Sequence, residues 1–443
     1  MMQKVSARST RTFIVIWTGQ FVSLIGSGLT QFALGVWVYL ETGSVTPLAL
    51  VALFATIPHL VVAPFAGVLV DRWDRRTAMI FSDAGAAVCT LAIAVLLYTD
   101  HLAVWHIYVT VAISSSFSTF QWPAYSAATT LLVPRRHLAR AAGMVQTAQS
   151  ASAILAPMIA GVLVVTIQIW GVFAIDFATF LFALVTLLVI RIPRPKITAE
   201  GQEGKGSFLK EVVFGWSYIR ARHGLLVLLM FFAGTNLVYS SFGVLFVPMV
   251  LSFASPAVLG TLQSAGGVGM LIGGLFLSVW GGPKRQVYGV VGFGFLGGAA
   301  AIFLGVRPSP LIIAAASFAS FFTLPIINGC SQAIWQVKTA PDVQGRVFSV
   351  RRAIAWSTTP ISYLLVGPLA DKVFEPALAV NGSLAGSIGE IIGTGPGRGI
   401  GLMFIVMGVF IMMVAVISFL YPRLRNVEDE LPDMVTEESE EDS

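Results

Sequence analysis

The residues of this sequence that could do chemistry are the few ionisable side chains inside long apolar stretches. They are Asp83, Asp176 and His59. A charged group at the centre of a bilayer costs about 2.5–3.5 kcal/mol on insertion scales, so these residues are candidates for binding and releasing a proton. Asp176 and His59 could instead make structural hydrogen bonds to neighbouring helices, and the sequence leaves both interpretations open.

Motifs of catalysis and metal binding are missing from the sequence. It contains no HExxH, no GxSxG and no Walker phosphate loop. Its two cysteines, Cys89 and Cys330, lie in apolar stretches without the spacing of a zinc site or a disulfide framework. We therefore expect no enzymatic activity, no catalytic residue, no metal site and no cofactor.

The composition indicates an integral membrane protein. Of 443 residues, 56% are hydrophobic and only 11% are charged, whereas soluble domains have about 25% charged residues. The basic residues are scattered in short clusters, so the net charge of +5 does not point to nucleic acid. About 20 apolar residues in a helix cross a bilayer, and stretches such as 91–98 and 180–190 are apolar on every side, unlike the alternating strands of a barrel.

The elements that must position the candidate residues are twelve predicted membrane helices, so the expected fold is all-α. Their approximate ranges are 13–40, 47–70, 77–98, 103–132, 139–165, 168–191, 223–251, 257–280, 286–306, 309–337, 345–371 and 399–421. All Lys and Arg residues except Arg307, Lys372 and Arg398 fall on one side of this arrangement. Because cytoplasmic loops are enriched in Lys and Arg, both termini are expected in the cytoplasm.

The spans divide into two bundles of six. We expect an N-terminal bundle at 1–191, a cytoplasmic linker at 192–222, a C-terminal bundle at 223–422 and an acidic, disordered tail at 423–443. Apolar residues between 208 and 219 share one helical face, which predicts an interfacial helix within the linker. An early start of the seventh span is the alternative.

The loop GVLVDRWDRR, 67–76, has more charge than topology requires. Asp71 and Arg75 are four residues apart and would face each other if one helix continued through them. Such a cluster can hold one bundle against another and release it. A charge-rich turn that only anchors the topology is the alternative.

This loop and the twelve spans resemble the major facilitator superfamily, and the resemblance covers nearly the whole chain. The family signature G-x-L-x-D-R-x-G-R-R is matched by Gly67, Leu69, Asp71, Arg72, Arg75 and Arg76. Asp74 replaces the second glycine of the signature. The resemblance implies two six-helix bundles and a conformational latch formed by Gly67, Asp71, Arg72, Arg75 and Arg76.

The fifth span resembles the motif of the antiporter members of that family, G-x8-G-x3-G-P-x2-G-G. The corresponding residues here are Gly143, Ser152, Ala156, Pro157, Ala160 and Gly161. Small residues let helices approach closely and a proline bends a helix, so the resemblance implies a tight helix seam that supports exchange. Many proton-coupled drug antiporters have an Arg in the fourth span, but 103–132 contains none, so their proton route is not transferred.

If the resemblance holds, the substrate pocket lies on the first, fourth, seventh and tenth spans. The polar and aromatic residues of these spans are Gln20, Gln31, Gln121, Trp122, Tyr125, Asn236, Tyr239, Asn328, Gln332 and Trp335. They are hydrogen-bonding or aromatic groups without strong charge, which suits a large amphiphile. Each could equally make helix-to-helix contacts.

The chain further resembles the exporter branch with macrolide-efflux proteins and siderophore exporters of the enterobactin type. We therefore expect a monomeric exporter in the inner or plasma membrane that exchanges an amphiphilic small molecule, such as a macrolide-like drug or a secreted metabolite, for protons. A siderophore exporter, a uniporter or uptake carrier, and a non-transporting membrane receptor or assembly factor are the alternatives.

Overall fold

The computed structural model describes residues 7–133, 138–190, 208–339 and 344–432. All of the regular secondary structure in these regions is helical. The protein forms two compact units. Unit 1 contains residues 1–197 and two short later pieces, 250–264 and 366–368, and the remainder forms unit 2. The division at 197 lies inside the predicted linker.

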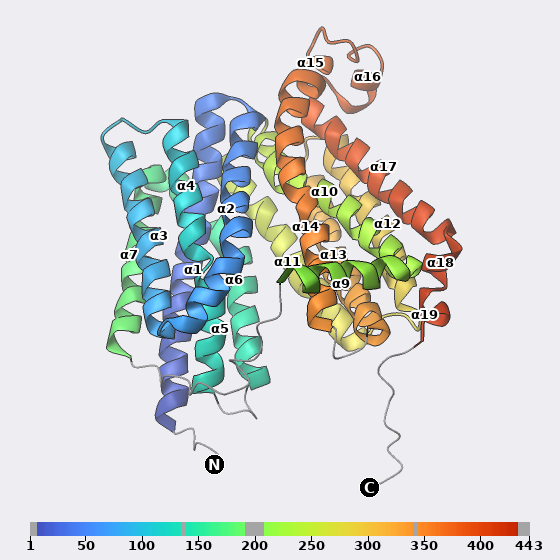
Figure 1. Ribbon diagram of the computed structural model, residues 1–443. Coiled ribbons are helices and arrows are strands. Elements are labelled where there is room, and N and C mark those ends of the chain that lie inside the picture. The colour runs from blue at the N-terminus through green and yellow to red at the C-terminus, as the bar shows by residue number, and fades with distance from the viewer. Residues whose placement is uncertain (1–6, 134–137, 191–207, 340–343, 433–443) are drawn as a thin grey trace. The chain divides into compact units, whose positions relative to one another are not determined.

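Unit 1 consists mainly of upright helices (Figure 1). In chain order they are α1 (Ala7–Thr42), α2 (Val45–Arg72), α3 (Arg75–Tyr98), α4 (Val104–Ser118), α5 (Gln121–Leu132), α6 (Leu138–Thr166) and α7 (Gln168–Val189). Buried apolar side chains of α1, α3, α5 and α7, among them Ile16, Met79, Leu132 and Leu187, form its main core.

Unit 2 contains the remaining helices, several of them short. They are α9 (Phe208–Ala221), α10 (His223–Leu251), α11 (Pro256–Trp280), α12 (Gln286–Val306), α13 (Pro310–Lys338), α14 (Gln344–Leu369), the π-helical turn η2 (Ala370–Phe374), α15 (Glu375–Ala377), α16 (Ile388–Ile392), α17 (Arg398–Leu420), α18 (Pro422–Arg425) and α19 (Val427–Glu430). The first part of α11 and the last part of α14 are counted with unit 1.

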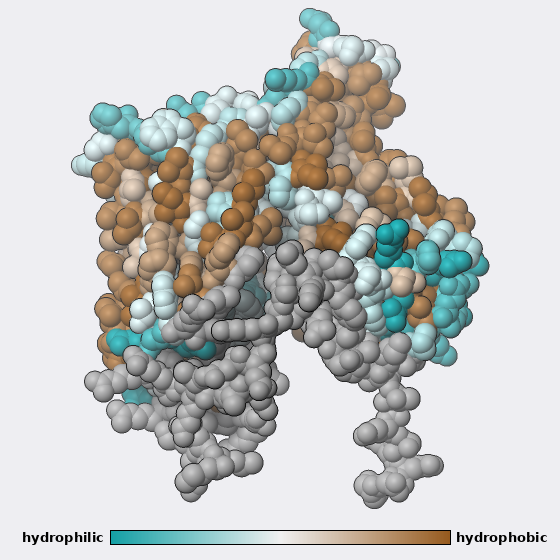
Figure 2. Space-filling model, viewed as in Figure 1, coloured by the Kyte–Doolittle hydropathy of each residue, from teal (hydrophilic) through white to brown (hydrophobic). Residues whose placement is uncertain are grey.

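Ten of the described helices are long and apolar enough to cross a membrane. Hydrophobic side chains cover the visible helix surfaces of each unit, and hydrophilic ones gather at the helix ends (Figure 2). Since lipid offers no hydrogen-bonding partners, backbone groups must pair within each helix, which is why apolar stretches of this length are helical. The predicted all-α membrane fold is confirmed.

Two of the twelve predicted spans are not among these ten. The predicted span 103–132 is broken at Thr119 and Phe120 into α4 and α5. Pro123 has no N–H to donate to the carbonyl of Thr119, which favours a break in the helix there. The predicted span 345–371 is one helix, α14, but Arg351 and Arg352 lower its hydropathy.

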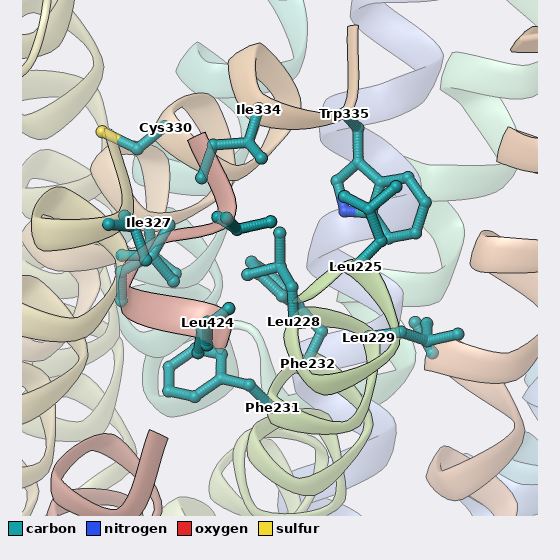
Figure 3. Close-up of a cluster of buried hydrophobic side chains, with 14 of the residues drawn as sticks. Leu225, Leu228, Leu229, Phe231, Phe232, Ile327, Cys330, Ile334, Trp335 and Leu424 are labelled. Carbon is teal, nitrogen blue, oxygen red and sulfur yellow. The ribbon is translucent and has the colours of Figure 1, made fainter. Parts of the chain in front are cut away.

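The predicted linker helix is a separate element of unit 2. Helix α9 ends at Ala221, and a single residue separates it from α10. Helix α9 lies across one end of the unit (Figure 1). Ile219 is fully buried in a cluster with Leu225, Trp335 and Leu424, part of which Figure 3 shows. Helix α9 is therefore fastened to unit 2 by apolar packing and is not an extension of α10.

Helices α12 and α17 cross at glycines. A Cβ on Gly298 would lie 2.8 Å from the carbonyl oxygen of Gly408, and a Cβ on Gly408 would lie 2.5 Å from that of Gly298. Gly305 and Gly401 approach each other in the same way. Because lipid gives no hydrophobic drive for helix association, such backbone proximity supplies packing instead.

The Gly-rich segment 370–397 folds over the end of unit 2 that begins α17 (Figure 1). The Glu375 carboxylate accepts hydrogen bonds from the backbone N–H of Ile400 at 2.8 Å and of Gly397 at 3.1 Å. Burial raises the pKa of this carboxyl, although the two N–H donors and Arg398 oppose the shift. Arg398 donates to the carbonyls of Ile392 and Gly305 at 3.0 and 3.2 Å. The segment is thus tied to the start of α17 by polar contacts, and Arg398 of α17 also bonds to α12.

At the other end of unit 2, the acidic chain after α17 is folded. The two carboxylate oxygens of Glu428 accept from the N–H groups of Gln286 and Val287, both at 3.0 Å, and so cap the start of α12. Asp429 forms an ion pair with Arg285 at 2.7 Å. The Tyr288 hydroxyl and Asp429 raise the pKa of the Arg285 guanidinium.

Apolar packing and a lysine add to these contacts. Leu424 and Val427 are fully buried, and Lys338 donates to the carbonyl oxygens of Glu428 and, at 2.6 Å, of Leu431. The predicted disordered tail 423–443 therefore begins with an ordered part, the helices α18 and α19. Residues 433–443 lie outside the described ranges.

We predict that Glu428→Ala lowers the free energy of unfolding by about 0.5–2 kcal/mol, the usual cost of losing an N-cap. Thermal unfolding of the purified protein would measure the change. Glu430→Ala is the matched control, because Glu430 is an exposed acid on the same short helix. Equal effects of the two substitutions would mean that acidic charge, and not the cap, is responsible.

Candidate functional site

A chain of three polar side chains links α1, α3 and α5 inside unit 1. The Asp83 carboxylate is almost fully buried and accepts from the Gln20 amide at 2.9 Å. The Gln121 amide donates to the Gln20 carbonyl oxygen at 2.5 Å. The fold thus brings two of the predicted pocket residues, Gln20 and Gln121, together with one predicted proton-sensitive residue.

Asp176 lies deeper, between α1, α3 and α7. Its side chain is 1% exposed and accepts from the hydroxyls of Thr90 at 3.3 Å and Thr179 at 3.4 Å. A Cβ on Gly26 of α1 would lie 2.7 Å from the carboxylate, so α1 comes this close only because residue 26 has no side chain. Within the described residues neither Asp83 nor Asp176 has a basic partner, and both partner sets are neutral.

His59 is not part of either group. The Nδ1 atom of His59 lies 3.0 Å from the Thr119 hydroxyl at the break between α4 and α5. His59 itself is an exposed residue of α2. The imidazole therefore contacts the side chain of Thr119 at the interrupted helix, which favours the structural interpretation of His59.

The loop between α2 and α3 is a turn, because α2 ends at Arg72 and α3 begins at Arg75. The single helix through Asp71 and Arg75, on which the expected pairing depends, is therefore interrupted between these two residues. Asp74 is the N-cap of α3 and accepts from the N–H of Arg76 at 2.9 Å, so the residue that departs from the family signature starts the next helix. The surroundings of Gly67 and the side chains of Asp71 and Arg72 lie outside the described part of the chain.

Two arginines of this loop contact backbone carbonyls. Arg76 donates to the carbonyls of Leu187 and Leu188, both at 2.6 Å, near the end of α7. Arg75 donates to the carbonyl of Val70 and, at 3.2 Å, to that of Trp73. Cations at helix C-termini are stabilised by the unpaired carbonyls there, so the loop fastens the ends of α2 and α7.

The small residues predicted as a seam on α6 have two sets of neighbours within unit 1. Ser152 donates to the carbonyl of Leu24 on α1 at 3.0 Å, and a Cβ on Gly28 would lie 2.6 Å from that of Ala156. Farther along, a Cβ on Gly161 would lie 2.6 Å from the carbonyl oxygen of Pro256.

Other members of the seam differ in their surroundings. Ala160 is fully buried. A Cβ on Gly260 of α11 would collide with the carbonyl oxygen of Pro157, so the two backbones approach closely because residue 260 has no side chain. Gly143 has no atom within 4 Å of an added Cβ. Close packing is thus found from Ser152 to Gly161 and not at Gly143.

Three predicted pocket residues line one small cavity inside unit 2. Asn236, Tyr239 and Asn328 share it with aromatic and aliphatic side chains such as Phe232. Its volume of about 30 Å³ is enough for a water molecule or two. The cavity is therefore far too small for a drug-sized amphiphile.

The last two predicted pocket residues of α13, Gln332 and Trp335, surround a residue that was not among the predicted pocket residues. Arg351 of α14 donates to Gln332 Oε1 at 2.9 Å and to the Ser331 hydroxyl at 3.2 Å. Its guanidinium carbon lies 5.0 Å from the Trp335 ring centroid. The signal for Arg351 in the sequence is its position inside the predicted span 345–371, where a basic residue equally marks topology.

Other predicted pocket residues are not brought together. Gln31 is exposed, the Trp122 side chain is 57% exposed, and Tyr125 is buried in the apolar core of unit 1. In the described part of the chain, no group of three His, Cys, Asp or Glu side chains could hold a metal ion.

Comparison with known proteins gives the family of this arrangement. A family model described as "Major Facilitator Superfamily" matches residues 16–362. "Macrolide efflux protein A" of Streptococcus pyogenes is 30% identical over 365 residues, which cover 82% of this chain and 90% of that protein. "Multidrug efflux pump Tap" of Mycolicibacterium fortuitum is 23% identical, covering 91% of this chain and 94% of the pump.

Solved structures show the same fold at low sequence identity. A bacterial homologue of the human lysosomal transporter Spinster, inward-facing and unoccupied, matches with a TM-score of 0.73 and 14% identity over 98% of this chain and all of the other. A mutant of the nucleoside transporter NupG matches with a TM-score of 0.69 and 12% identity over 92% of this chain and 98% of its own.

We predict opposite effects for two glycine substitutions in α6. Gly161→Ala should lower the free energy of unfolding by about 1–3 kcal/mol, because the new methyl group meets backbone atoms that must move. Gly143→Ala, the matched control, should be neutral or stabilise by about 0.5–1 kcal/mol, because alanine favours a helix and the site is open. Thermal unfolding checks both, and equal stability of the two variants would contradict the tight seam.

Proposed function

Because the chain belongs to the Major Facilitator Superfamily, a family of membrane transporters and not of enzymes, we propose that it is a secondary active exporter. It expels amphiphilic small molecules, such as a macrolide-like drug or a secreted metabolite, by alternating access. Entry of protons drives the cycle. The protein acts as a monomer in the cell membrane with both termini in the cytoplasm, as the distribution of basic residues favours.

The export direction is supported by the relatives. Macrolide efflux protein A of Streptococcus pyogenes and that of Enterococcus faecalis are both 30% identical to this chain, and the latter is covered over 97% of its length. An efflux function in relatives that match almost from end to end favours efflux here over uptake.

An amphiphilic substrate is supported by the chemistry of the polar residues inside the helices. Gln20 and Gln121 in unit 1 and Asn236 in unit 2 are neutral hydrogen-bonding groups among apolar and aromatic side chains. Sites with few polar anchors in apolar surroundings suit drug-like molecules.

Proton coupling is supported by Asp83, and this is the observation that carries the proposal. Its carboxylate has no basic partner within the described residues and is hydrogen-bonded to Gln20, which in turn holds Gln121. A proton gained or lost at Asp83 would change the hydrogen bonds that Gln20 can make. Because Gln20 and Gln121 are both predicted pocket residues, the change would reach the predicted substrate pocket directly. Asp176 is bonded to threonine hydroxyls at the packed meeting of α1, α3 and α7, which favours a structural role.

The charged loop 67–76 and the α6 seam fit the same cycle. We assign the loop the role of a conformational latch and the seam that of a tight, sliding contact that supports exchange. Arg76 fixes the loop to α7, and Asp74 caps the start of α3. These contacts within unit 1 hold the loop in place, as a conformational latch requires.

We predict that Asp83→Asn reduces macrolide export driven by a pH gradient at least about tenfold, because the asparagine cannot exchange a proton. Asp176→Asn should keep most of the export and lower stability by about 1 kcal/mol through weakened hydrogen bonds. The assay is uptake of a radiolabelled macrolide into inverted proteoliposomes with an imposed pH gradient, with and without a protonophore. Asp100→Asn, an exposed acid in the turn after α3, is the matched control.

The same proteoliposomes separate loss of coupling from loss of folding. Asp83→Asn should still exchange labelled for unlabelled macrolide when no gradient is applied. Proton-driven export by Asp83→Asn at the rate of Asp100→Asn would refute the assignment. Transport that ignores the protonophore would indicate a uniporter, and no transport of any amphiphile, siderophores included, would indicate a receptor or assembly factor.

A further inference from the structure

Arg351 is a charged residue near the start of α14, and its guanidinium donates only to neutral groups within the described residues. Its guanidinium donates to Gln332 Oε1 and to the Ser331 hydroxyl, at 2.9 and 3.2 Å. Ser331 is fully buried. A cation that is partly withdrawn from water among buried side chains is costly unless an opposite charge balances it, so this arrangement favours an anion.

Two aromatic rings fix the orientation of the guanidinium. Its central carbon lies 5.0 Å from the Trp335 ring centroid and 5.9 Å from that of Phe232, which is cation–π distance. Both rings are buried and belong to the apolar cluster in Figure 3. The rings and Gln332 hold one side of the group, so its position is set before any ligand binds.

The donors around this position outnumber the acceptors. A guanidinium has five N–H groups and never loses its charge, and only two of its nitrogens have partners among the described residues. The indole N–H of Trp335 is buried without an acceptor among them. A buried donor without an acceptor is expensive, and an oxygen-rich anion would supply the acceptors.

The neighbouring residue shows that charge alone is not the distinguishing feature. Arg352 is also on α14 but is exposed to the surroundings, and no contact of its side chain with α13 is found among the described residues. A snorkelling arginine would resemble Arg352. Arg351 instead turns to α13 and is held there by two hydrogen bonds.

We propose that Arg351, with Gln332 and Ser331 as its positioning residues, binds an oxyanion, either a carboxylate or a phosphate, on an amphiphile. The planar fork of the guanidinium matches the geometry of both groups. The anion belongs either to a transported amphiphile or to a phospholipid headgroup. In the first case this inference rests on the proposed export function and adds amphiphiles with an acidic group to its substrates.

The test is direct binding of dodecyl phosphate, with dodecanol as the uncharged probe, to the purified protein in phosphatidylcholine nanodiscs. Arg351→Gln should weaken dodecyl phosphate binding about tenfold to a hundredfold, as expected for lost charge-assisted hydrogen bonds. Arg351→Lys, which keeps the charge and loses the fork, should fall in between. Arg352→Gln, the matched control, should stay within about twofold of the original protein.

Equal binding of dodecyl phosphate by the original protein and Arg351→Gln, or binding of dodecanol as tight as that of dodecyl phosphate, would overturn the site. If phosphatidylglycerol in the nanodisc displaces the probe, the site holds a lipid headgroup; if it does not, the site serves a transported anion. Because this assay needs no transport, its result is independent of export. Unchanged export of a neutral macrolide by Arg351→Gln would place the site outside proton coupling.

Discussion

The rest of the structure depends on one constraint: in hydrocarbon, every polar group must find its partner within the protein. Backbone groups meet it through helices, and side chains meet it through short bonds to neighbouring helices, as between Asp83 and Gln20 or between Ser152 and the carbonyl of Leu24. At the helix ends, capping side chains bind the backbone N–H groups that have no partner within the helix. Glu428 at the start of α12, Glu375 at the start of α17 and Asp74 at the start of α3 each satisfy N–H groups that a helix cannot satisfy itself.

The same constraint explains which residues merit a functional interpretation. Asp83 and Arg351 have opposite charges, and each lies among neutral partners in a different unit. Asp176 is as deeply buried, but its threonine partners and the close approach of Gly26 describe a packing site. For a buried charged residue, the number of hydrogen-bond partners therefore says little about function. It matters more whether those partners could exchange their hydrogen bonds during a transport cycle.

Hydropathy and charge predicted the all-α membrane fold, because long apolar stretches have few alternatives to a helix in lipid. They did not predict the break at Thr119, although Pro123 was a visible reason for it. The acidic composition after 423 concealed Leu424 and Val427, whose burial is a tertiary effect. Among the pocket residues, Gln20 and Gln31 lie about three turns apart on nearly the same face of one helix. Only the packing shows that Gln20 has polar partners while Gln31 is exposed. Arg351 is not predictable as a binding residue from the sequence, because a basic residue near a helix end also marks topology.

The glycine crossing of α12 and α17 has a consequence for how unit 2 deforms. With Gly298 against Gly408 and Gly305 against Gly401, no acyl chain can slip between the two helices and neither can rotate about its axis without a backbone collision. The two helices are therefore expected to move together as one rigid body. Spectroscopic labels on these two helices would keep a constant spacing and could serve as an internal ruler for motions elsewhere in the molecule.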